Sequence, residues 1–368
     1  MPRILIVTEA DDFHAIAGAE ALARKGAEVV LWATSDFPTC SEESAYFNPD
    51  GAKTIRVQGT DLDLLNPTFD AVWRRRPTYV LNEKALHPAD RSFADNECSM
   101  FRRSFFFLLA PDAFWVNPLE GAARAGSKLL QHEAAGKIGL KMPATLFSNS
   151  PTQIRDFLAE SGGALVYKKL SAAGWKNKDR QFLAYTALVT RENLVPDEVL
   201  RQTPGIFQEV VPKEYELRVT VMGKRAFAAK VFSQQTEAGK LDWRRAYDEL
   251  RFEPTHLPPE LEQKCVALLA ELGLVFGCLD FVVTPGGQHI FLEVNEMGQF
   301  LFVERYCGVP LLDAFSEFLL QGSVDFDWSE ESVAVRYADQ EFETAAMSRS
   351  KEFLRSHVRR PGALVDEG

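Results

Sequence analysis

The stretch LDFVVTPGGQHIFLEVNE, residues 279–296, carries three oxygen-bearing side chains in otherwise apolar segments: Asp280, Glu293 and Asn295. Two extended runs flank Gly286–Gly287, a dipeptide typical of a two-residue β-hairpin turn. A hairpin centred on that turn would pair Asp280 with Glu293 across its two strands. Because side chains alternate along a strand, the three polar groups are expected on one face.

The same register predicts further pairs, with Pro285 opposite Gln288 and Cys278 opposite Asn295. The other face would be wholly apolar and would consist of Leu279, Phe281, Val283, Ile290, Leu292 and Val294. Two carboxylates directly opposite each other repel, and a divalent cation between them would relieve this. Hard oxygen ligands without paired cysteine or clustered histidine favour magnesium or manganese. The alternative interpretation is a solvated polar face on an edge hairpin.

Cations that could contact phosphates lie upstream, on separate elements. Lys128 falls in a helix expected over Gly121–Lys137. Lys168 ends the strand ALVYKK, and the small-residue loop LSAAGWKNKD after it could fold over phosphates with its backbone N–H groups. Lys169 replaces Lys168 if the strand is read one residue later. Taken alone, each lysine is better explained as an exposed surface residue.

The stretch FQEVVPKEYELRVTV, residues 207–221, offers groups that suit a nucleoside. Its first part is expected to be extended and to present backbone groups to an adenine edge. Glu216 and Arg218 alternate onto one face of the next strand, where a carboxylate can bind ribose hydroxyls and a guanidinium can bind oxyanions. Lys230 and Arg244 are further candidate cations. An isolated Glu-x-Arg is more often a surface ion pair worth at most ~1 kcal/mol, so both interpretations stay open.

The elements that position these groups can be outlined from apolar periodicity. A strand at Arg3–Thr8, a helix at Asp12–Lys25 and a strand at Glu28–Ala33 predict a β-α-β opening and a small parallel sheet, to which Phe69–Trp73 returns. Clustered proline and glycine near Asn117–Pro118 predict a domain boundary. We expect four segments, 1–116, 117–205, 206–322 and a polar tail, 323–368, with one amphipathic helix at Glu341–Val358.

Bulk properties exclude several classes of protein. A chain of 368 residues, 46% hydrophobic and 25% charged, suits a soluble protein of two or three domains. The net charge of -11 argues against nonspecific nucleic-acid binding. Five cysteines without a CxxC pair indicate reduced thiols in a cytoplasmic protein, with no zinc site. The longest apolar run, SFFFLLA, is short of the ~20 residues that span a bilayer, and no signal peptide is evident.

The order of these motifs resembles the ATP-grasp superfamily: a helix lysine, a strand lysine, a QE-V-V hinge, Glu-x-Arg, then Asp and Glu-x-Asn on a terminal hairpin. Within it the chain is similar to the graspetide synthetases, the microviridin-type ligases that macrocyclise ribosomal peptides. Supporting segments are ILIVTEADDFHA, AVWRRRP, DWR at 242–244 and NEMGQFLFVE. Relatives often have proline after Glu-x-Asn, whereas this chain has Glu296, which we expect to face solvent.

The resemblance implies an α/β chain in which an N-terminal parallel pre-ATP-grasp domain, 1–116, precedes an α+β ATP-grasp fold. Residues 117–205 would form its central subdomain and 206–322 its C-terminal subdomain. The implied nucleotide ligands are Lys128, Lys168, Glu209, Val210, Val211, Glu216 and Lys230, with the hinge at the adenine and Glu216 at the ribose. Magnesium, two ions or manganese in its place, would be held by Asp280, Glu293 and Asn295. Arg218 and Arg244 would stabilise the reacting carboxyl phosphate.

The implied activity is an ATP-dependent ligase that activates Asp or Glu side chains of a precursor peptide as acyl phosphates and closes ω-ester or ω-amide rings. Its partners would be ATP and a precursor with a leader helix and an acidic core, and the chain would form a homodimer. Two alternatives are a RimK-like ligase that adds amino acids to a protein or small acid, and an ATP-binding scaffold without turnover. The sequence does not choose between ester and amide.

Two segments can each be interpreted in more than one way. The basic run Trp73–Pro77 would contact an acidic peptide or phosphate, or else would blunt a sheet edge with charge and proline. The tail after Ser323 would pack on the body of the protein or mediate dimerisation. His14 and His132 are expected to be structural or surface groups, because the mechanism requires no nucleophile on the enzyme.

Overall fold

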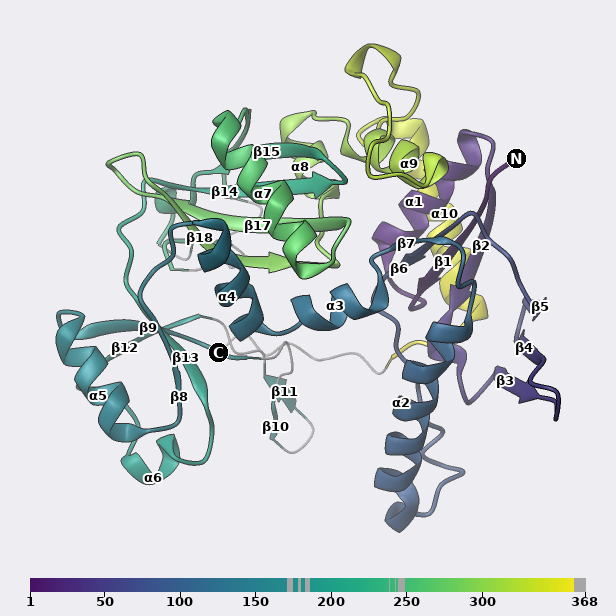
Figure 1. Ribbon diagram of the computed structural model, residues 1–368, viewed down its shortest axis with the longest axis horizontal. Coiled ribbons are helices and arrows are strands. Elements are labelled where there is room, and N and C mark those ends of the chain that lie inside the picture. Colours follow the sequence, from purple (N-terminus) through teal and green to yellow (C-terminus); the bar gives the residue numbers. More distant parts are fainter. Residues whose placement is uncertain are drawn as a thin grey trace. The chain divides into compact units, whose positions relative to one another are not determined.

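The computed structural model describes residues 1–170, 175–177, 180–182, 186–237, 239–241, 243 and 249–360 (Figure 1). The chain divides into two compact units. The first comprises Met1–Glu120, Met222–Lys224 and residues 299–360, and the second comprises Gly121–Val221 and Arg225–Gly298. Each unit has its own sheets and apolar core. The division into four segments stays a prediction.

The first unit is built on a four-stranded parallel sheet with the order β2-β1-β6-β7. Its strands are β1 (Arg3–Thr8), β2 (Glu28–Ala33), β6 (Ala71–Arg74) and β7 (Phe114–Val116), and α1 (Phe13–Arg24) connects the first two. The predicted β-α-β opening and the return of the third strand are confirmed. Near-continuous apolar runs such as RILIVT are typical of strands that are covered on both faces.

Apolar layers cover both faces of this sheet. One face packs on the antiparallel meander β3 (Glu42–Phe47), β4 (Lys53–Gln58) and β5 (Asp63–Leu65) and on the end of α2 (Arg91–Leu108). On the other face, Trp73 of β6 contacts Phe315 of α9 (Leu311–Gln321), with ring centroids 4.6 Å apart. The meander was not predicted, because its strands are short and largely exposed.

The basic run at Trp73–Pro77 does not blunt a sheet edge. β6 lies between β1 and β7, so that interpretation is wrong for its strand residues. The Arg75 side chain is fully buried, and its Nε lies 2.7 Å from Asp12 Oδ2. Arg74 stacks over the Phe106 ring, whereas Arg76 is exposed. Contact of this run with an acidic peptide or phosphate stays a prediction, and Arg76 is its exposed arginine.

The tail packs on the first unit. The remaining helices here are α8 (Leu301–Cys307) and α10 (Gln340–Ser356), and α10 lies along α1 (Figure 1). Phe353 of α10 is buried against Ile16 and Ala33. Beyond the helix, His357 Nδ1 lies 2.7 Å from Asp36 Oδ2. The tail therefore packs on the body of the protein, and a role in dimerisation stays a prediction. His14, as expected, is structural, since its Nε2 accepts the N–H groups that open α8.

The second unit contains two larger sheets. An antiparallel sheet of order β12-β9-β13-β8 packs on α5 (Pro151–Glu160) and α6 (Asp197–Leu200), and its strands are β8 (Thr145–Ser148), β9 (Ala164–Lys168), β12 (Ala187–Thr190) and β13 (Gly205–Glu209). A five-stranded sheet has the order β16-β15-β14-β17-β18, with strands β14 (Tyr215–Met222), β15 (Arg225–Val231), β16 (Phe252–Thr255), β17 (Phe276–Val283) and β18 (His289–Asn295).

Two helices cover the five-stranded sheet. α4 (Lys128–Ile138) and α7 (Pro259–Leu272) share the largest core of this unit with β14, β17 and β18. The helix expected over Gly121–Lys137 is instead two helices, because α3 (Leu119–Ala125) stops before Ser127, which caps α4. A short hairpin, β10 (Trp175–Asn177) and β11 (Arg180–Phe182), completes the unit. None of the helices in the described part of the chain is long and apolar enough to cross a membrane.

Candidate active site

The hairpin of β17 and β18 pairs Asp280 with Glu293 and Cys278 with Asn295, as predicted. The prediction for the turn is wrong. The N–H of Gly287 donates to Thr284 O, and the N–H of Thr284 donates to Gln288 O, so the turn has three residues and Pro285 does not face Gln288. Gly287 has a φ of +74°, a conformation that glycine adopts without strain.

A β-bulge in β18 explains why the pairing is nevertheless correct. Phe281 pairs with Phe291 and Asp280 pairs with Glu293, so Leu292 is the extra residue between them. The predicted apolar face is therefore wrong at two positions. Ile290 pairs with Val282, a cavity-lining residue, and Leu292 itself lines the cavity. Phe291 takes their place in the core.

The three predicted oxygen-bearing side chains lie together. The amide of Asn295 is 3.4 Å from Asp280 Oδ2 and 3.5 Å from Glu293 Oε1 through its Nδ2. Within the described ranges, no cluster of three or more His, Cys, Asp or Glu side chains is placed to hold a metal ion. A cation at this point would therefore use the Asn295 amide as well as the two carboxylates. These hard donors fit magnesium, and metal binding stays a prediction.

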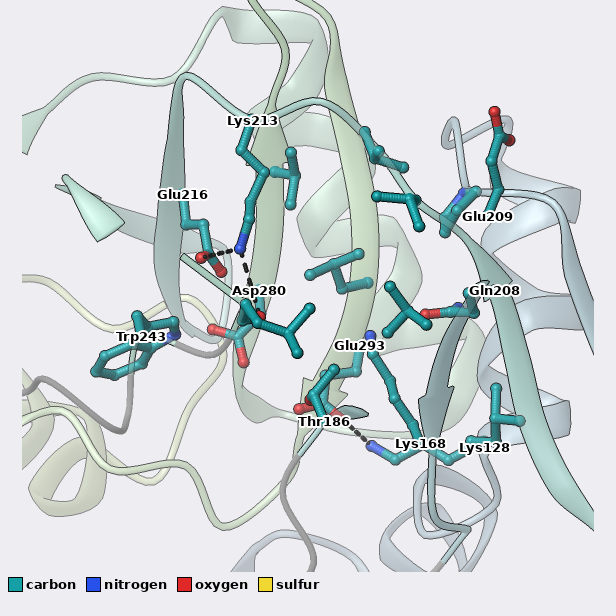
Figure 2. A pocket seen from close by; sticks show the side chains of 18 of the residues that line it. Lys128, Lys168, Thr186, Gln208, Glu209, Lys213, Glu216, Trp243, Asp280 and Glu293 are labelled. Carbon is teal, nitrogen blue, oxygen red and sulfur yellow. Dashed lines mark hydrogen bonds and ion pairs between the residues drawn. The ribbon is translucent and has the colours of Figure 1, made fainter. Parts of the chain in front are cut away.

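Each of the two carboxylates has a cationic partner. Lys128, the first residue of α4, places its Nζ 2.5 Å from Glu293 Oε2. Gln131 fixes this arrangement, because its side chain both accepts the N–H of Val294 and donates to the Val294 carbonyl. α4 is thereby pinned to β18, and the lysine lies beside the acid (Figure 2).

Arg218 of β14 holds Asp280 from the neighbouring strand. Its Nη1 lies 2.9 and 3.0 Å from the two carboxylate oxygens, and both side chains are nearly buried. Burial alone would lower the pKa of Arg218, but the negative charge of Asp280 outweighs it and the pKa is raised. Arg218 is not among the described residues that line the cavity, so it contacts the site through Asp280.

These groups border a cavity of about 620 Å³ between the two larger sheets of the second unit. Most of the predicted site residues meet here: Lys128, Lys168, Glu209, Val210, Val211, Glu216, Asp280, Glu293 and Asn295 all line it. Lys169, the alternative to Lys168, lines it too. Lys230 is not among the described lining residues and lies over the Tyr215 ring. Arg244 lies outside the described residues.

Glu216 lies at one end of the cavity with Lys213 (Figure 2). Lys213 Nζ is 2.9 Å from Glu216 Oε1, and the two side chains are 13% and 7% exposed. Burial raises the pKa of Glu216. The charge and hydrogen bond of Lys213 reduce this rise but do not cancel it, so the pKa stays above its usual value. Ser233, fully buried, also hydrogen-bonds the carboxylate.

His132 lies one turn after Lys128 on α4 and also lines the cavity. Its Nδ1 is 3.0 Å from the Lys128 carbonyl, and its Nε2 is 3.4 Å from Gln208 Nε2. Burial, with the charges of Lys168 and Lys128, lowers the pKa of His132. The ring is therefore neutral near pH 7, with the Nδ1–H tautomer donating to the carbonyl.

The lining residues that sequence reasoning missed include Lys213, His132 and Gln208. Helical spacing would have found His132, since residues i and i+4 share a helix face and Lys128 was already a candidate. Gln208 of β13 pairs with Val166 of β9, and Ile206 pairs with Lys168. This pairing, which the sequence alone does not show, brings Gln208 near the candidate lysine. Lys213 lies in the link before β14, where no periodicity applies.

Comparisons with known proteins agree with this geometry. A family model described as the MvdD pre-ATP grasp domain matches residues 3–123. The macrocyclase MdnB from Microcystis aeruginosa MRC is 30% identical, with a TM-score of 0.73 over 87% of this chain and 99% of that chain. A RiPP-associated ATP-grasp ligase from Chryseobacterium gregarium, solved with ADP and a leader and core peptide, is 26% identical, with a TM-score of 0.77 over 87% and 96%.

A curated relative carries a different name. The probable alpha-L-glutamate ligase 2 of Shewanella amazonensis is 24% identical over 286 residues, which are 75% of this chain and 83% of that protein. Both kinds of relative are ligases. Their names differ in the acceptor that they imply.

Proposed function

This chain belongs to the graspetide synthetases, the microviridin-type ATP-grasp ligases, and on that premise we propose that it macrocyclises a ribosomal precursor peptide. It would activate Asp or Glu side chains of the peptide as acyl phosphates and close ω-ester or ω-amide rings. The observation that carries the proposal is the meeting of Asp280, Glu293 and Asn295 beside a cavity lined by lysines.

The cavity has the groups that a nucleoside triphosphate requires. Lys128 and Lys168 would bind phosphate oxygens, since both line the same cavity and carry compact positive charges. The link Glu209–Val211 would offer backbone groups to the adenine, and Glu216 would accept hydrogen bonds from the ribose. Lys230 lies apart from these groups, so its proposed contact with the nucleotide has the least support.

Asp280, Glu293 and Asn295 would hold magnesium, with manganese as a substitute. A divalent cation held by these residues would offset the negative charge that develops on the transferred phosphoryl group. The ligands converge from two paired strands, so the sheet fixes their spacing before any ion binds. Arg218 would hold the Asp280 carboxylate oriented toward the cavity.

The reaction would proceed in two transfers. A carboxylate oxygen of the peptide attacks the γ-phosphorus of ATP, and ADP leaves with the bonding electrons, which forms an acyl phosphate. A lysine amine or a Ser or Thr hydroxyl of the same peptide then attacks the acyl carbon, loses its proton, and expels inorganic phosphate. Arg218 or Arg244 was predicted to stabilise the oxyanion of this second step, a proposal that rests on the resemblance alone.

The proposed peptide partner follows from the relatives. The Chryseobacterium gregarium ligase was solved with a leader and a core peptide, which supports a precursor with both parts here. An alternative function is favoured by the glutamate ligase resemblance, namely the addition of amino acids to a protein or small acid. A homodimer and a cytoplasmic location stay predictions.

Mass spectrometry of a precursor peptide, encoded beside this gene and incubated with the enzyme, ATP and magnesium, tests the proposal. Macrocyclisation removes one water per ring, so the peptide should lose that mass in whole steps while ADP and phosphate accumulate. A gain equal to one amino-acid residue per step, with glutamate supplied, would instead identify the alternative ligase. Turnover of neither kind, with ATP bound, would contradict both and leave the scaffold interpretation.

A further inference from the structure

The backbone beside Lys213 is anchored to β17. It lies in the link between β13 and β14, where the N–H of Glu214 donates to the Val283 carbonyl at 2.8 Å. The Lys213 ammonium donates to Glu216 and, at 3.5 Å, to the Leu241 carbonyl. A solvated surface pair would be more exposed than 13% and 7%. The segment between β13 and β14 therefore places a positive charge beside Glu216, where both side chains are largely shielded from solvent.

We propose that Lys213 is a positioning residue of the nucleotide site, which fixes the charge and orientation of Glu216 so that this carboxylate binds the ribose hydroxyls. The inference rests on the proposed function, which puts the ribose at Glu216. It concerns recognition of the sugar, and therefore the preference of the enzyme for ATP over a deoxynucleotide.

The chemistry of the acceptor explains why the ammonium is required. An ionised carboxylate only accepts hydrogen bonds, and its two oxygens have room for the ribose hydroxyls beside Lys213 and Ser233. A protonated Glu216 would present an O–H and lose part of that capacity. Because an isolated buried carboxylate is costly to ionise, the state that binds hydroxyls depends on a neighbouring cation.

The position of Lys213 argues against direct contact with the phosphates. Figure 2 shows Lys213 and Glu216 on one side of Asp280, whereas Lys128 and Lys168 lie on the other. The two phosphate-binding lysines therefore occupy the opposite end of the cavity. Lys213 completes a pattern in which three buried or half-buried carboxylates each have a cation: Glu216 with Lys213, Asp280 with Arg218, and Glu293 with Lys128.

Calorimetric binding of ATP and of 2′-deoxy-ATP to the full chain, without peptide, tests the inference. Wild-type protein should prefer ATP by about three- to tenfold, the worth of one hydrogen bond. Lys213→Met should weaken ATP binding by about tenfold and bring the preference close to one. Lys213→Arg, which keeps the charge, should retain much of it. Lys137→Met removes a lysine that is half exposed on α4, and it should behave as wild type.

The outcomes separate the inference from the function beneath it. An unchanged preference in Lys213→Met, or equal weakening of both nucleotides, would overturn the positioning role, because a purely structural lysine affects both alike. Wild-type protein that binds no ATP would instead overturn the proposed function. In the double variant with Glu216→Gln, the losses should not add, since the lysine acts through the acid.

Discussion

Lys128 Nζ lies 2.5 Å from Glu293 Oε2, whereas Asn295 Nδ2 lies 3.5 Å from Glu293 Oε1, so the lysine takes one of the two oxygens that the proposed metal could use. Lys128 is also a proposed phosphate ligand. The two roles compete, because one ammonium cannot hold Glu293 closely and turn fully toward a phosphate. Nucleotide phosphates would draw Lys128 away and release Glu293 for magnesium.

We predict that Lys128→Met binds Mn²⁺ more tightly than wild type when no nucleotide is present. Removing the competing ammonium leaves Glu293 open to the ion, and a gain of about tenfold corresponds to ~1.4 kcal/mol. Electron paramagnetic resonance of free Mn²⁺ measures this directly. ATP binding should weaken in the same variant, because a phosphate ligand is lost.

Lys168→Met is the charge-matched control for that experiment. It removes one positive charge from the same cavity, whereas the 2.5 Å pair of Lys128 and Glu293 remains. Equal gains in Mn²⁺ affinity for both variants would show that net charge alone is responsible. Only a larger gain in Lys128→Met supports the competition.

A second prediction concerns the ion pair of Arg218 and Asp280. Lys at position 218 keeps the positive charge but lacks the rigid, planar guanidinium that aims Nη1 at both Asp280 oxygens. Arg218→Lys should therefore fold normally and lose turnover more than ATP affinity, as measured by steady-state ADP release. Arg218→Met removes the guanidinium partner of a nearly buried carboxylate, and it should cost ~3–5 kcal/mol of unfolding free energy in a denaturant titration. An equal loss of turnover and affinity in Arg218→Lys would contradict the positioning of Asp280.

The third prediction tests the metal ligands. Glu293→Gln keeps the shape of the side chain and removes its charge, so ADP release with peptide should fall below detection while the circular dichroism spectrum stays unchanged. Asn295→Ala should behave in the same way. Glu296→Gln is the control: this neighbouring acid is half-buried, not fully solvent-facing as expected, and it is not among the described residues that line the cavity. Full activity in Glu293→Gln would remove the metal assignment.

The fourth prediction concerns pH and the contact of His357 with Asp36. Burial lowers the pKa of His357, but its bond to Asp36 outweighs that and the pKa is raised above 6.5. Its stabilising contribution is therefore complete below pH 6.5 and is lost as pH rises through the folded pKa. Burial raises the pKa of Asp36, but the bonds to His357 and to the N–H of Val358 outweigh this effect, and the pKa falls below its usual value of 3.8. That contribution is present above pH 3.8 and is lost as pH falls through the depressed folded pKa.

The tail should therefore be held most firmly between these two limits. Hydrogen exchange of α10 should become faster from pH 6 to pH 9, after correction for the intrinsic rate, and more so in wild type than in His357→Gln. The glutamine can still donate to Asp36 but does not titrate. Identical pH profiles for the two proteins would mean that the imidazole does not hold the tail.

Much of the fold could be predicted because its strands and helices have strong local signals. RILIVT, which is buried, and EVVLWA, which is only partly buried, are strands with the expected bounds, and Pro259–Leu272 is a helix that begins at proline and ends before glycine. The pairing of Asp280 with Glu293 was also predicted. The pairing is correct although the turn was predicted wrongly. The extra residue in the turn and the extra residue in the bulge together replace one cross-strand pair, so Asp280 still faces Glu293.

The remainder depended on contacts between segments far apart in the sequence. That Arg218 binds Asp280 depends on β14 lying beside β17, which no spacing in the sequence reveals. The burial of Arg75 against Asp12 likewise requires β6 to lie inside the sheet. From the sequence alone, a basic run is expected on the surface, because the buried acid that pairs with it is identified only by the fold.

The bulge in β18 gives two consecutive residues, Leu292 and Glu293, to the same wall of the cavity. A hydrocarbon side chain beside the acid lowers the local dielectric constant, which strengthens the attraction between Glu293 and any cation near it. In the proposed reaction, the same apolar wall would keep bulk solvent from the acyl phosphate, which water would otherwise hydrolyse before the ring closes. In a regular strand, Leu292 would have turned inward, and that protection would be lost.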